Sequence, residues 1–311
     1  MKLILPVAGK GERLKPYTLI LPKCLLPVAG KPILNWIIES TQQLPITETL
    51  FITGYKSECI ESHLQKQNWG QTRIIEQKDP QGLAQAIQLC LPYLTDDEPV
   101  LIILGDTLFK ADLNDLKKSD TNILMTLKVE NPERFGVAIK NEAGEITKLV
   151  EKPKEFVSNE ALVGLYYIKD VAALKKAIDT IISEDKRTKG EYQLTDALQL
   201  MIENGIQFKT QNIDQWLDCG LKETLLETNA TLISENDNSN KNQYPDTQII
   251  VPCYIGKGVK ITSSQIGPNV AIGDNCQIEN CNLQNSIVWE NASLKDSTHH
   301  NDILADEVRA G

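Results

Sequence analysis

The sequence predicts an α/β protein with a doubly wound, mainly parallel sheet, followed by a short left-handed parallel β-helix. Apolar runs typical of buried strands alternate with segments of helical periodicity along most of the chain. Near the C-terminus, aliphatic residues recur at intervals of five or six, the hexapeptide period of a β-helix. A polar segment of low complexity separates the two patterns. We therefore expect domains at 1–234 and 247–311, joined by a polar linker at 235–246.

The N-terminal elements are expected in alternating order. Residues 100–104 form the clearest strand, because five successive apolar residues suit a parallel sheet that is covered on both faces. Residues 33–43 carry apolar side chains at the spacing of one helix face. Further strands are expected at 3–7, 49–54, 73–76, 122–129, 136–140 and 161–168, further helices at 57–67, 82–91, 172–184, 195–204 and 221–234, and a turn at 141–144.

The C-terminal repeat predicts stacked coils. Its aliphatic positions are Ile255, Ile261, Ile266, Ile272, Ile278 and Leu283. Each rung of such a repeat places one aliphatic side chain inward, and stacking buries these side chains in a column. Residues 249–295 are enough for two or three coils, and a few loose antiparallel strands are the alternative. The polar tail from Ser297 onward is expected to fray or to form a weak cap.

Composition excludes several classes of function. The 311 residues are 41% hydrophobic and 24% charged, which is ordinary for a soluble globular protein. The N-terminal apolar stretch is too short for a signal peptide, and no apolar run approaches the roughly 20 residues that span a membrane. We expect a cytoplasmic protein without a membrane partner. A net charge of −10 without a basic stripe argues against nucleic acid as a partner.

Cysteine and histidine carry no signal of a site. The 7 cysteines form no C-x-x-C pair and no cluster with histidine, which is typical of reduced thiols in the cytosol. With only 3 histidines, two of them adjacent at 299 and 300, neither a histidine-based mechanism nor a zinc site is expected.

The first strand runs into a Gly-rich turn that suits a polyphosphate. Glycines let successive backbone N–H groups approach phosphate oxygens, and Arg13 and Lys23 add full positive charges. Gly9-Lys10-Gly11 lacks both the G-x-G-x-x-G spacing and the ending of a P-loop. An ordinary strand-to-helix turn is the alternative.

Asp106 ends the apolar strand at 100–104. In open α/β sheets ligands lie beyond the carboxyl ends of the strands, so an aspartate there is a candidate Mg²⁺ ligand. A helix cap or a turn is the alternative role for this aspartate.

Five motifs in order resemble those of the sugar-phosphate nucleotidylyltransferases, a family that includes glucose-1-phosphate thymidylyltransferase and relatives that use UTP or GTP. The first is Gly9-Lys10-Gly11-Glu12-Arg13-Leu14 with Pro16, Thr18 and Pro22-Lys23. The others lie at 77–86, 135–137 with 151–153, 162–166 with 189–196, and 216–220. The resemblance covers residues 1–234 and implies a Rossmann-like nucleotidyltransferase domain.

The resemblance implies a reaction. A sugar 1-phosphate oxygen attacks the α-phosphorus of a nucleoside triphosphate and pyrophosphate leaves, with Mg²⁺ as cofactor. The substrates expected are dTTP and glucose 1-phosphate, which give dTDP-glucose. The Pro6-Val7 start and Cys24 depart from the thymidylyl branch, so UTP- and GTP-dependent enzymes of the UDP-glucose or GDP-mannose type stay open. A non-catalytic subunit that binds nucleotide-sugars is a further alternative.

The resemblance also implies roles for single residues. Arg13 and Lys23 would hold the triphosphate, Asp106 and Asp218 would bind Mg²⁺, and Lys152 would orient the attacking phosphate. The nucleotide would contact Ala8, Gly9, Gly11, Glu12, Gln77 and Gly82. The sugar phosphate would contact Gly136, Glu151, Lys152, Val163 and Lys189.

Three of these assignments have plain structural alternatives. Gly82 could be a loop glycine before a helix, and Glu151-Lys152 could lie in a solvated turn. Lys189 stands where the family often has arginine, which keeps the charge but loses the bidentate fork. The β-helix is expected to make homo-oligomers. Acyl transfer on it is disfavoured, because the only histidines near it lie beyond the repeats.

Overall fold

The computed structural model describes residues 1–239 and 243–306, and these divide into two compact units. The first combines Met1–Gly9 with Ile37–Trp216. The second combines Lys10–Trp36 with the described residues from Leu217 onward. The segment that follows the first glycine of the Gly-rich turn therefore belongs with the C-terminal part of the chain.

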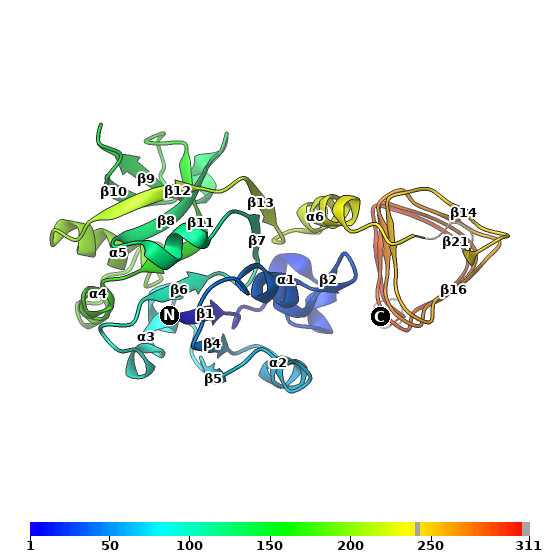
Figure 1. The fold of residues 1–311 in the computed structure, drawn as a ribbon, viewed down its shortest axis with the longest axis horizontal. Helices are drawn as coiled ribbons and strands as arrows, with labels where there is room; N and C mark the ends of the chain where they lie inside the picture. The colour runs from blue at the N-terminus through cyan, green and yellow to red at the C-terminus, as the bar shows by residue number, and fades with distance from the viewer. Residues whose placement is uncertain (240–242, 307–311) are drawn as a thin grey trace. The chain divides into compact units, whose positions relative to one another are not determined.

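The first unit is built on a nine-stranded sheet in the order β10-β9-β11-β6-β1-β4-β5, with β8 beside β11 and β12 beside β8 (Figure 1). Its strands are β1 (Lys2–Pro6), β4 (Glu48–Thr53), β5 (Thr72–Glu76), β6 (Val100–Ile103), β8 (Asn122–Lys128), β9 (Gly136–Lys140), β10 (Ile146–Glu151), β11 (Glu160–Ile168) and β12 (Phe208–Asn212). β6, β1, β4 and β5 run parallel, whereas β11 runs antiparallel to its neighbours β6, β8 and β9. The predicted α/β class is confirmed, with a sheet that is mixed rather than uniformly parallel.

Six α-helices and six short 3-10 helices complete the described part of the chain before the C-terminal repeat. The helices are α1 (Ile33–Ser40), α2 (Ser57–Leu64), α3 (Leu83–Gln88), α4 (Val171–Ser183), α5 (Leu194–Glu203) and α6 (Lys222–Glu235). Aliphatic side chains of α3, α4 and α5 share one buried core with the sheet. The 3-10 helices are η1 (Glu12–Leu14), η2 (Tyr17–Leu19), η3 (Lys23–Leu25), η4 (Leu91–Tyr93), η5 (Asn114–Lys118) and η6 (Pro132–Arg134).

Strands that the sequence pattern did not reveal are short, with two to five residues each. They are β2 (Pro27–Val28), β3 (Lys31–Pro32), β7 (Thr107–Lys110), β12 and β13 (Gln215–Asp218). β12 buries Phe208 but carries Lys, Thr, Gln and Asn after it, so its apolar alternation is too weak to detect. It forms because its backbone pairs in parallel with β8, a contact that local sequence does not encode.

The C-terminal strands form a parallel β-helix, as predicted. They are β14 (Gln248–Ile249), β15 (Cys253–Ile255), β16 (Lys260–Thr262), β17 (Gln265–Ile266), β18 (Val270–Ile272), β19 (Gln277–Gln284), β20 (Ile287–Val288), β21 (Ser293–His300) and β22 (Ile303–Leu304). Partners in the ladders lie one coil apart, as in Ile249 with Ile266 and Ile266 with Leu283, so the aliphatic side chains stack in buried columns.

The ends of the repeat differ from expectation. The tail does not begin at Ser297, because β21 continues to His300 and β22 pairs with β20 through buried Ile303 and Leu304. Residues 307–311 lie outside the described residues. Within the predicted linker, Asn238 exchanges hydrogen bonds with the backbone of Ile255. Positions 240–242 are not described, and the domain boundaries stay a prediction.

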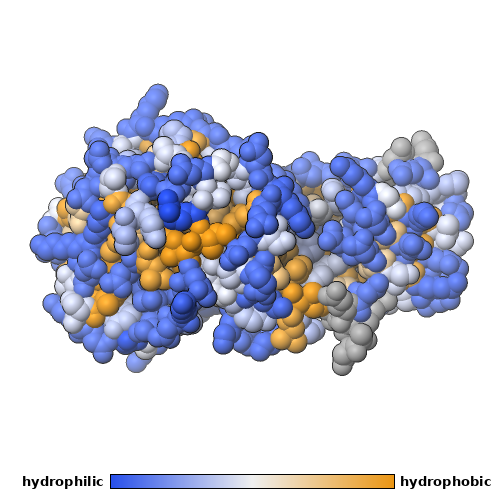
Figure 2. Space-filling view, turned by 90° about the horizontal axis from the view of Figure 1, so that it is seen from below, coloured by the Kyte–Doolittle hydropathy of each residue, from blue (hydrophilic) through white to orange (hydrophobic). Residues whose placement is uncertain are grey.

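The surface is mostly polar. The face in Figure 2 is largely blue, with apolar side chains gathered in a few orange patches. Large apolar side chains exposed among the described residues are Leu19, Ile74, Tyr93, Phe156, Val157 and Val251. None of the helices in that part of the chain combines the length and the apolar character that crossing a membrane requires.

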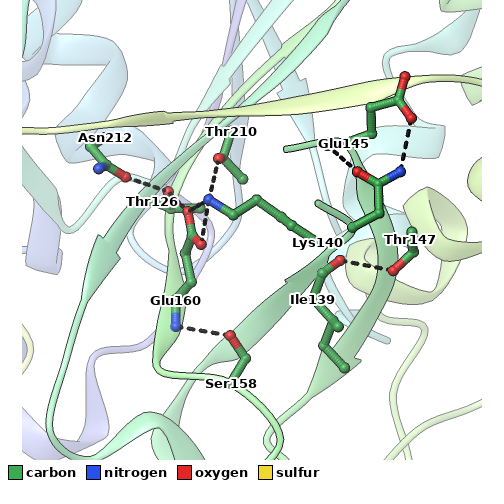
Figure 3. A network of polar contacts seen from close by, with 10 residues as sticks. Thr126, Ile139, Lys140, Glu145, Thr147, Ser158, Glu160, Thr210 and Asn212 are labelled. Atoms are coloured by element: carbon green, nitrogen blue, oxygen red, sulfur yellow. Dashed lines mark hydrogen bonds and ion pairs between the residues drawn. The ribbon is translucent and has the colours of Figure 1, made fainter. Parts of the chain in front are cut away.

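A buried carboxylate joins four strands of the sheet (Figure 3). Glu160 on β11 is 5% exposed and accepts hydrogen bonds from Lys140 Nζ on β9 at 2.7 Å and from Thr126 Oγ1 on β8 at 2.9 Å. Lys140 Nζ also donates to Thr210 Oγ1 on β12 at 3.1 Å. Burial raises the pKa of Glu160, and the hydrogen bonds from Lys140 and Thr126 lower it. The lowering effects together are larger, so the pKa lies below its ordinary value of 4.5.

We expect Lys140→Met to lower the free energy of unfolding by about 2 kcal/mol at pH 7, because it leaves a charged hydrogen-bond acceptor buried without its ion partner. A carboxylate whose pKa is lower in the folded protein than in the unfolded chain stabilises the fold at pH values above its ordinary pKa. This stabilisation is lost as the pH falls through the pKa of the folded state. Urea melts from pH 7 to pH 3 should show the difference from wild type shrinking below about pH 4.5. Lys148→Met, on the exposed face of β10, is the matched control. A difference that stays constant with pH would contradict the assignment.

Candidate functional site

The carboxyl ends of parallel strands bring Ala8 and Gln77 together in the first unit. Gly54, which follows β4, lies between them: a Cβ on it would stand 3.0 Å from Ala8 Cβ and 3.2 Å from Gln77 O. Tyr55 N donates to Ala8 O at 3.2 Å, and Gln77 N donates to Thr53 O at 2.7 Å. Two residues expected to contact nucleotide thus share one edge of the sheet, as the topology rule requires.

Gly82 is the point at which the predicted base loop meets another loop. It has φ +122°, and a Cβ on it would stand 2.5 Å from Tyr192 O. Ala84 N donates to Tyr192 O and Tyr192 N donates to Gln81 O, each at 2.9 Å. The loop glycine is therefore a site of close backbone approach, which only glycine allows.

Arg187 reinforces this contact, and sequence reasoning missed it. Its Nη2 donates to Gln81 Oε1 and to Tyr192 OH, both at 2.8 Å, and its guanidinium lies 3.9 Å from the Tyr192 ring centroid. Its Nε donates to Asp185 Oδ1 at 2.7 Å. Because Arg187 and Gln81 lie far apart in sequence, no local motif could have linked them.

The predicted sugar-phosphate residues surround Glu151. Thr195 Oγ1 donates to Glu151 Oε2 at 2.8 Å, and a Cβ on Gly136 would stand 3.0 Å from the same oxygen. Lys152 Nζ lies 3.5 Å from Glu151 Oε1. Lys189 Nζ donates to Lys152 O at 3.1 Å. Two ammonium groups and one carboxylate thus lie at the end of β10, beside a backbone that carries no side chain at Gly136.

Val163 is fully buried, with 0% of the residue exposed, so neither its side chain nor its backbone lies at the surface in this structure. The register of β11 against β8 shifts between Leu162 and Tyr166, which frees this part of β11 from a regular ladder. Gly164, with φ +82°, sits so close to Leu104 that a Cβ would stand 2.7 Å from Leu104 Cδ1.

The charges of Asp106 and Glu151 both affect the pKa of the buried side chain of Tyr166. Burial raises the pKa of Tyr166, and the negative charges of Glu151 and Asp106 raise it further. Asp196 is a third acid in this region: burial, chiefly, and the charge of Glu151 raise its pKa, and its Oδ2 has no hydrogen-bond partner among the residues that the structure describes. The first unit therefore places acidic groups where metal or hydroxyl groups could be bound.

In the second unit, Gly11 lies at the start of the predicted phosphate loop, which runs from Gly11 to Lys23. Its φ is +63°, and a Cβ on it would stand 2.8 Å from Thr18 Cγ2 and 3.2 Å from Lys23 Cβ. Thr18 Oγ1 donates to Gly11 O at 3.0 Å. The two ends of the loop, with Lys23 among them, are therefore folded onto each other. Glu12 is exposed, and its hydrogen bond with Lys15 holds its pKa below the ordinary value.

Arg13 and Asp218 converge above Gly220, also in the second unit. A Cβ on Gly220 would stand 3.2 Å from Arg13 Nη2 and 3.0 Å from Asp218 Oδ1. Gly220 N donates to Asp218 Oδ1 at 3.0 Å, which fixes this carboxylate. A guanidinium and a carboxylate that meet over bare backbone suit the binding of phosphate together with a cation.

The predicted site residues thus divide between the units. Ala8, Gly9, Gln77, Gly82, Asp106, Gly136, Glu151, Lys152, Val163 and Lys189 lie in the first, and Gly11, Glu12, Arg13, Lys23 and Asp218 lie in the second. Across residues 1–239 and 243–306, no three His, Cys, Asp or Glu side chains group closely enough to hold a metal ion by themselves.

The chain resembles known nucleotidyltransferases. The sequence model of a family described as nucleotidyl transferase matches residues 2–235. Low-salt glycan biosynthesis nucleotidyltransferase Agl11 of Haloferax volcanii is 31% identical over 326 residues, covering 96% of this chain and 90% of that protein. Glucose-1-phosphate thymidylyltransferase of Streptomyces antibioticus is 30% identical over 322 residues, covering 94% and 88%. The solved structure of UDP-glucose pyrophosphorylase complexed with UDP-glucose matches with a TM-score of 0.64 at 25% identity, covering 75% of this chain and 98% of that one.

We expect Gly82→Ala to lower the free energy of unfolding by about 3 kcal/mol, because a Cβ would meet the Tyr192 backbone as well as strain a positive φ. The matched control is Gly144→Ala, where φ is +80° but no atom lies within 4 Å of the new Cβ. There the loss should be about 1 kcal/mol. Chemical denaturation of both variants measures the difference, and equal losses would refute the close contact.

Proposed function

The chain belongs to the nucleotidyl transferase family of sugar-1-phosphate nucleotidyltransferases, and on this premise we propose that it transfers a thymidylyl group from dTTP to glucose 1-phosphate. The observation that carries the choice of substrates is the extent of the thymidylyltransferase match, which covers 94% of this chain. That alignment includes the β-helix as well as the catalytic part. The sequence match to UTP–glucose-1-phosphate uridylyltransferase AglF of Haloferax volcanii covers 76% of this chain, at 32% identity.

The reaction joins two polyanions. An oxygen of the sugar 1-phosphate forms a bond to the α-phosphorus of dTTP, the bond from that phosphorus to the bridging oxygen breaks, and pyrophosphate leaves with the electron pair. Positioning and neutralisation of charge supply most of the catalysis in such transfers. The loop that Gly11 begins would bind the triphosphate through backbone N–H groups, with Arg13 and Lys23 supplying positive charge.

The sugar phosphate would bind around Glu151. Lys152 and Lys189 supply two ammonium groups for its phosphate, and the 3.1 Å hydrogen bond from Lys189 Nζ to Lys152 O keeps them on adjacent loops. Glu151, held by Thr195, would accept hydrogen bonds from sugar hydroxyls. Gly136 would offer its backbone, since it has no side chain and lies beside the Glu151 carboxylate. Val163 is fully buried here, so a contact from it would need this part of β11 to move.

The base would bind at Gln77 and Gly82. Gln77 Nε2 donates to Gln85 Oε1 at 2.6 Å, so the amide is held in one orientation. Its remaining donor and its acceptor match the edge of a pyrimidine that carries an imide. Thymine and uracil present the same imide edge and differ only by a methyl group. UTP is therefore the second candidate nucleotide, and the match to UDP-glucose pyrophosphorylase supports it.

We propose Mg²⁺ as the cofactor, with Asp106 and Asp218 as its protein ligands. Both offer carboxylate oxygens, and Mg²⁺ commonly takes one or two carboxylates together with substrate phosphates. The lack of a larger ligand cluster among the described residues fits this coordination. When bound, the ion would neutralise charge on the phosphates. Gly220 N orients Asp218 for this role.

The test is pyrophosphate release from dTTP, UTP, GTP, CTP and ATP, each against several sugar 1-phosphates, with Mg²⁺ and with chelator. We expect the strongest signal with dTTP and glucose 1-phosphate, abolished by chelator. A stronger signal with UTP would show that UTP is the nucleotide substrate and would leave the proposed reaction unchanged. Nucleotide binding without release of pyrophosphate in any pair would favour a regulatory subunit.

Asp106→Asn should reduce kcat at least about 100-fold at saturating Mg²⁺, because it removes a charge on which the transition state depends. Asp97→Asn, at an exposed turn, is the control and should leave kcat unchanged. Circular dichroism melts of both variants separate loss of activity from loss of fold. Turnover within threefold of wild type in a folded Asp106→Asn variant would overturn the metal assignment.

A further inference from the structure

The segment Lys10–Trp36 packs on the β-helix coil by coil within the second unit. At its C-terminal end, Gly30 has φ +86°, and a Cβ on it would stand 2.0 Å from Cε1 of Tyr254 on β15. Backbone therefore lies flat on an aromatic ring of the β-helix. No other residue type fits at Gly30 without moving one of the two.

Helix α6 connects the same segment to the next coil. Asn229 is 0% exposed, and its Oδ1 accepts a hydrogen bond from Ala29 N at 2.9 Å. Its Nδ2 donates to Asn269 O at 3.4 Å. A buried amide with partners on both sides fixes the distance between them, because losing either bond would leave a buried polar group unsatisfied.

A third contact lies nearer the Gly-rich turn. Tyr17 and Trp289 are each 7% exposed, and their ring centroids lie 6.4 Å apart at an angle of 50°. Lys222, at the start of α6, forms an ion pair with Asp302 at 2.8 Å. Lys222 also interacts with the Tyr17 side chain: burial lowers the pKa of Lys222, but Asp302 and Tyr17 together raise it above its ordinary value.

The β-helix side chains that make these contacts lie outside the apolar core of the β-helix, although their backbones belong to its ladders. Its aliphatic columns form a core of their own, in which neither Trp289 nor Asp302 takes part. Trp289 Nε1 is buried without a hydrogen-bond partner in the part of the chain that the structure describes, so the indole contributes its ring and not a polar contact. The ring is placed for packing against Tyr17.

The supported segment has little regular structure of its own. Before α1 begins at Ile33, it contains three 3-10 helices of three residues each and two strands of two residues each. Elements this short are not stable alone, because each fixes several dihedral angles for few hydrogen bonds. Tyr17 directly precedes Thr18, whose hydroxyl holds Gly11 O. A contact that fixes Tyr17 therefore also restrains Gly11, through the neighbouring Thr18 hydroxyl.

We propose that the β-helix serves as the scaffold of the triphosphate loop, and that Trp289, Lys222 and Asp302 are positioning residues for Gly11, Arg13 and Lys23. This inference rests on the proposed function, since it assigns the loop to the nucleotide. It gives the C-terminal module a role in the reaction that needs no ligand on the module itself.

The test compares three β-helix variants in the full chain. Trp289→Leu removes the ring that meets Tyr17, and Trp289→Phe restores an aromatic ring. Leu294→Ala, at a 1% exposed position in an aliphatic column, is the matched control because it destabilises the β-helix away from the loop. We expect Trp289→Leu to raise KM for the nucleotide about tenfold, equal to about 1.4 kcal/mol of binding, with KM for the sugar 1-phosphate unchanged. Trp289→Phe should recover most of the loss, and Leu294→Ala should lower the Tm but not shift KM.

Hydrogen exchange supplies a readout that does not depend on activity. Amides of Glu12–Leu19 should exchange faster in Trp289→Leu and at the wild-type rate in Leu294→Ala. Unchanged exchange and KM in Trp289→Leu would overturn the scaffold, as would an equal rise of KM in Leu294→Ala. If wild-type protein turns over no nucleotide, the proposed function fails, and the exchange rates alone then decide whether the β-helix holds the loop.

Discussion

Close approach of backbone to its neighbours is the constraint on which the candidate site depends. Gly82 and Gly30 each lie against a tyrosine at a distance that a Cβ would make impossible, and Gly136 and Gly220 leave room for carboxylates. At Gly82 and Gly30 the missing side chain lets two parts of the chain pack together, whereas at Gly136 and Gly220 it leaves bare backbone beside a carboxylate. Close packing elsewhere in the two cores then keeps that backbone in place.

Charge is distributed so that an acidic chain can still bind anions. The net charge of −10 is spread over the whole sequence, whereas Arg13 and Lys23 in one unit and Lys152 and Lys189 in the other provide cations at the predicted phosphate positions. Interactions between exposed charges fade within about 10 Å at ordinary ionic strength. The few charges nearest the substrate therefore outweigh the distant acidic surface, and net charge is a poor guide to the sign of the ligand.

Sequence reasoning succeeded where the physical signal is local. Five apolar residues in a row predict β6, and the recurring isoleucines predict the columns of the β-helix. It failed where partners are distant. β12 exists because β8 pairs with it, and Arg187 matters because Gln81, far away along the chain, accepts its hydrogen bond. The resemblance supplied the candidate residues, but only coordinates could show that Glu151 is held by Thr195.

The same reasoning explains why the proposed scaffold role of the β-helix could not be predicted from sequence. A hexapeptide repeat is encoded by its own period, so it indicates a stacked fold and says nothing about what that fold supports. The contacts on which the proposal rests are made by Tyr254, Asn269 and Trp289, which occupy positions outside the repeat pattern. A repeat with regular ladders is rigid because each coil fixes the next. A loop built of isolated 3-10 turns gains most from such a neighbour, because it has the least order of its own.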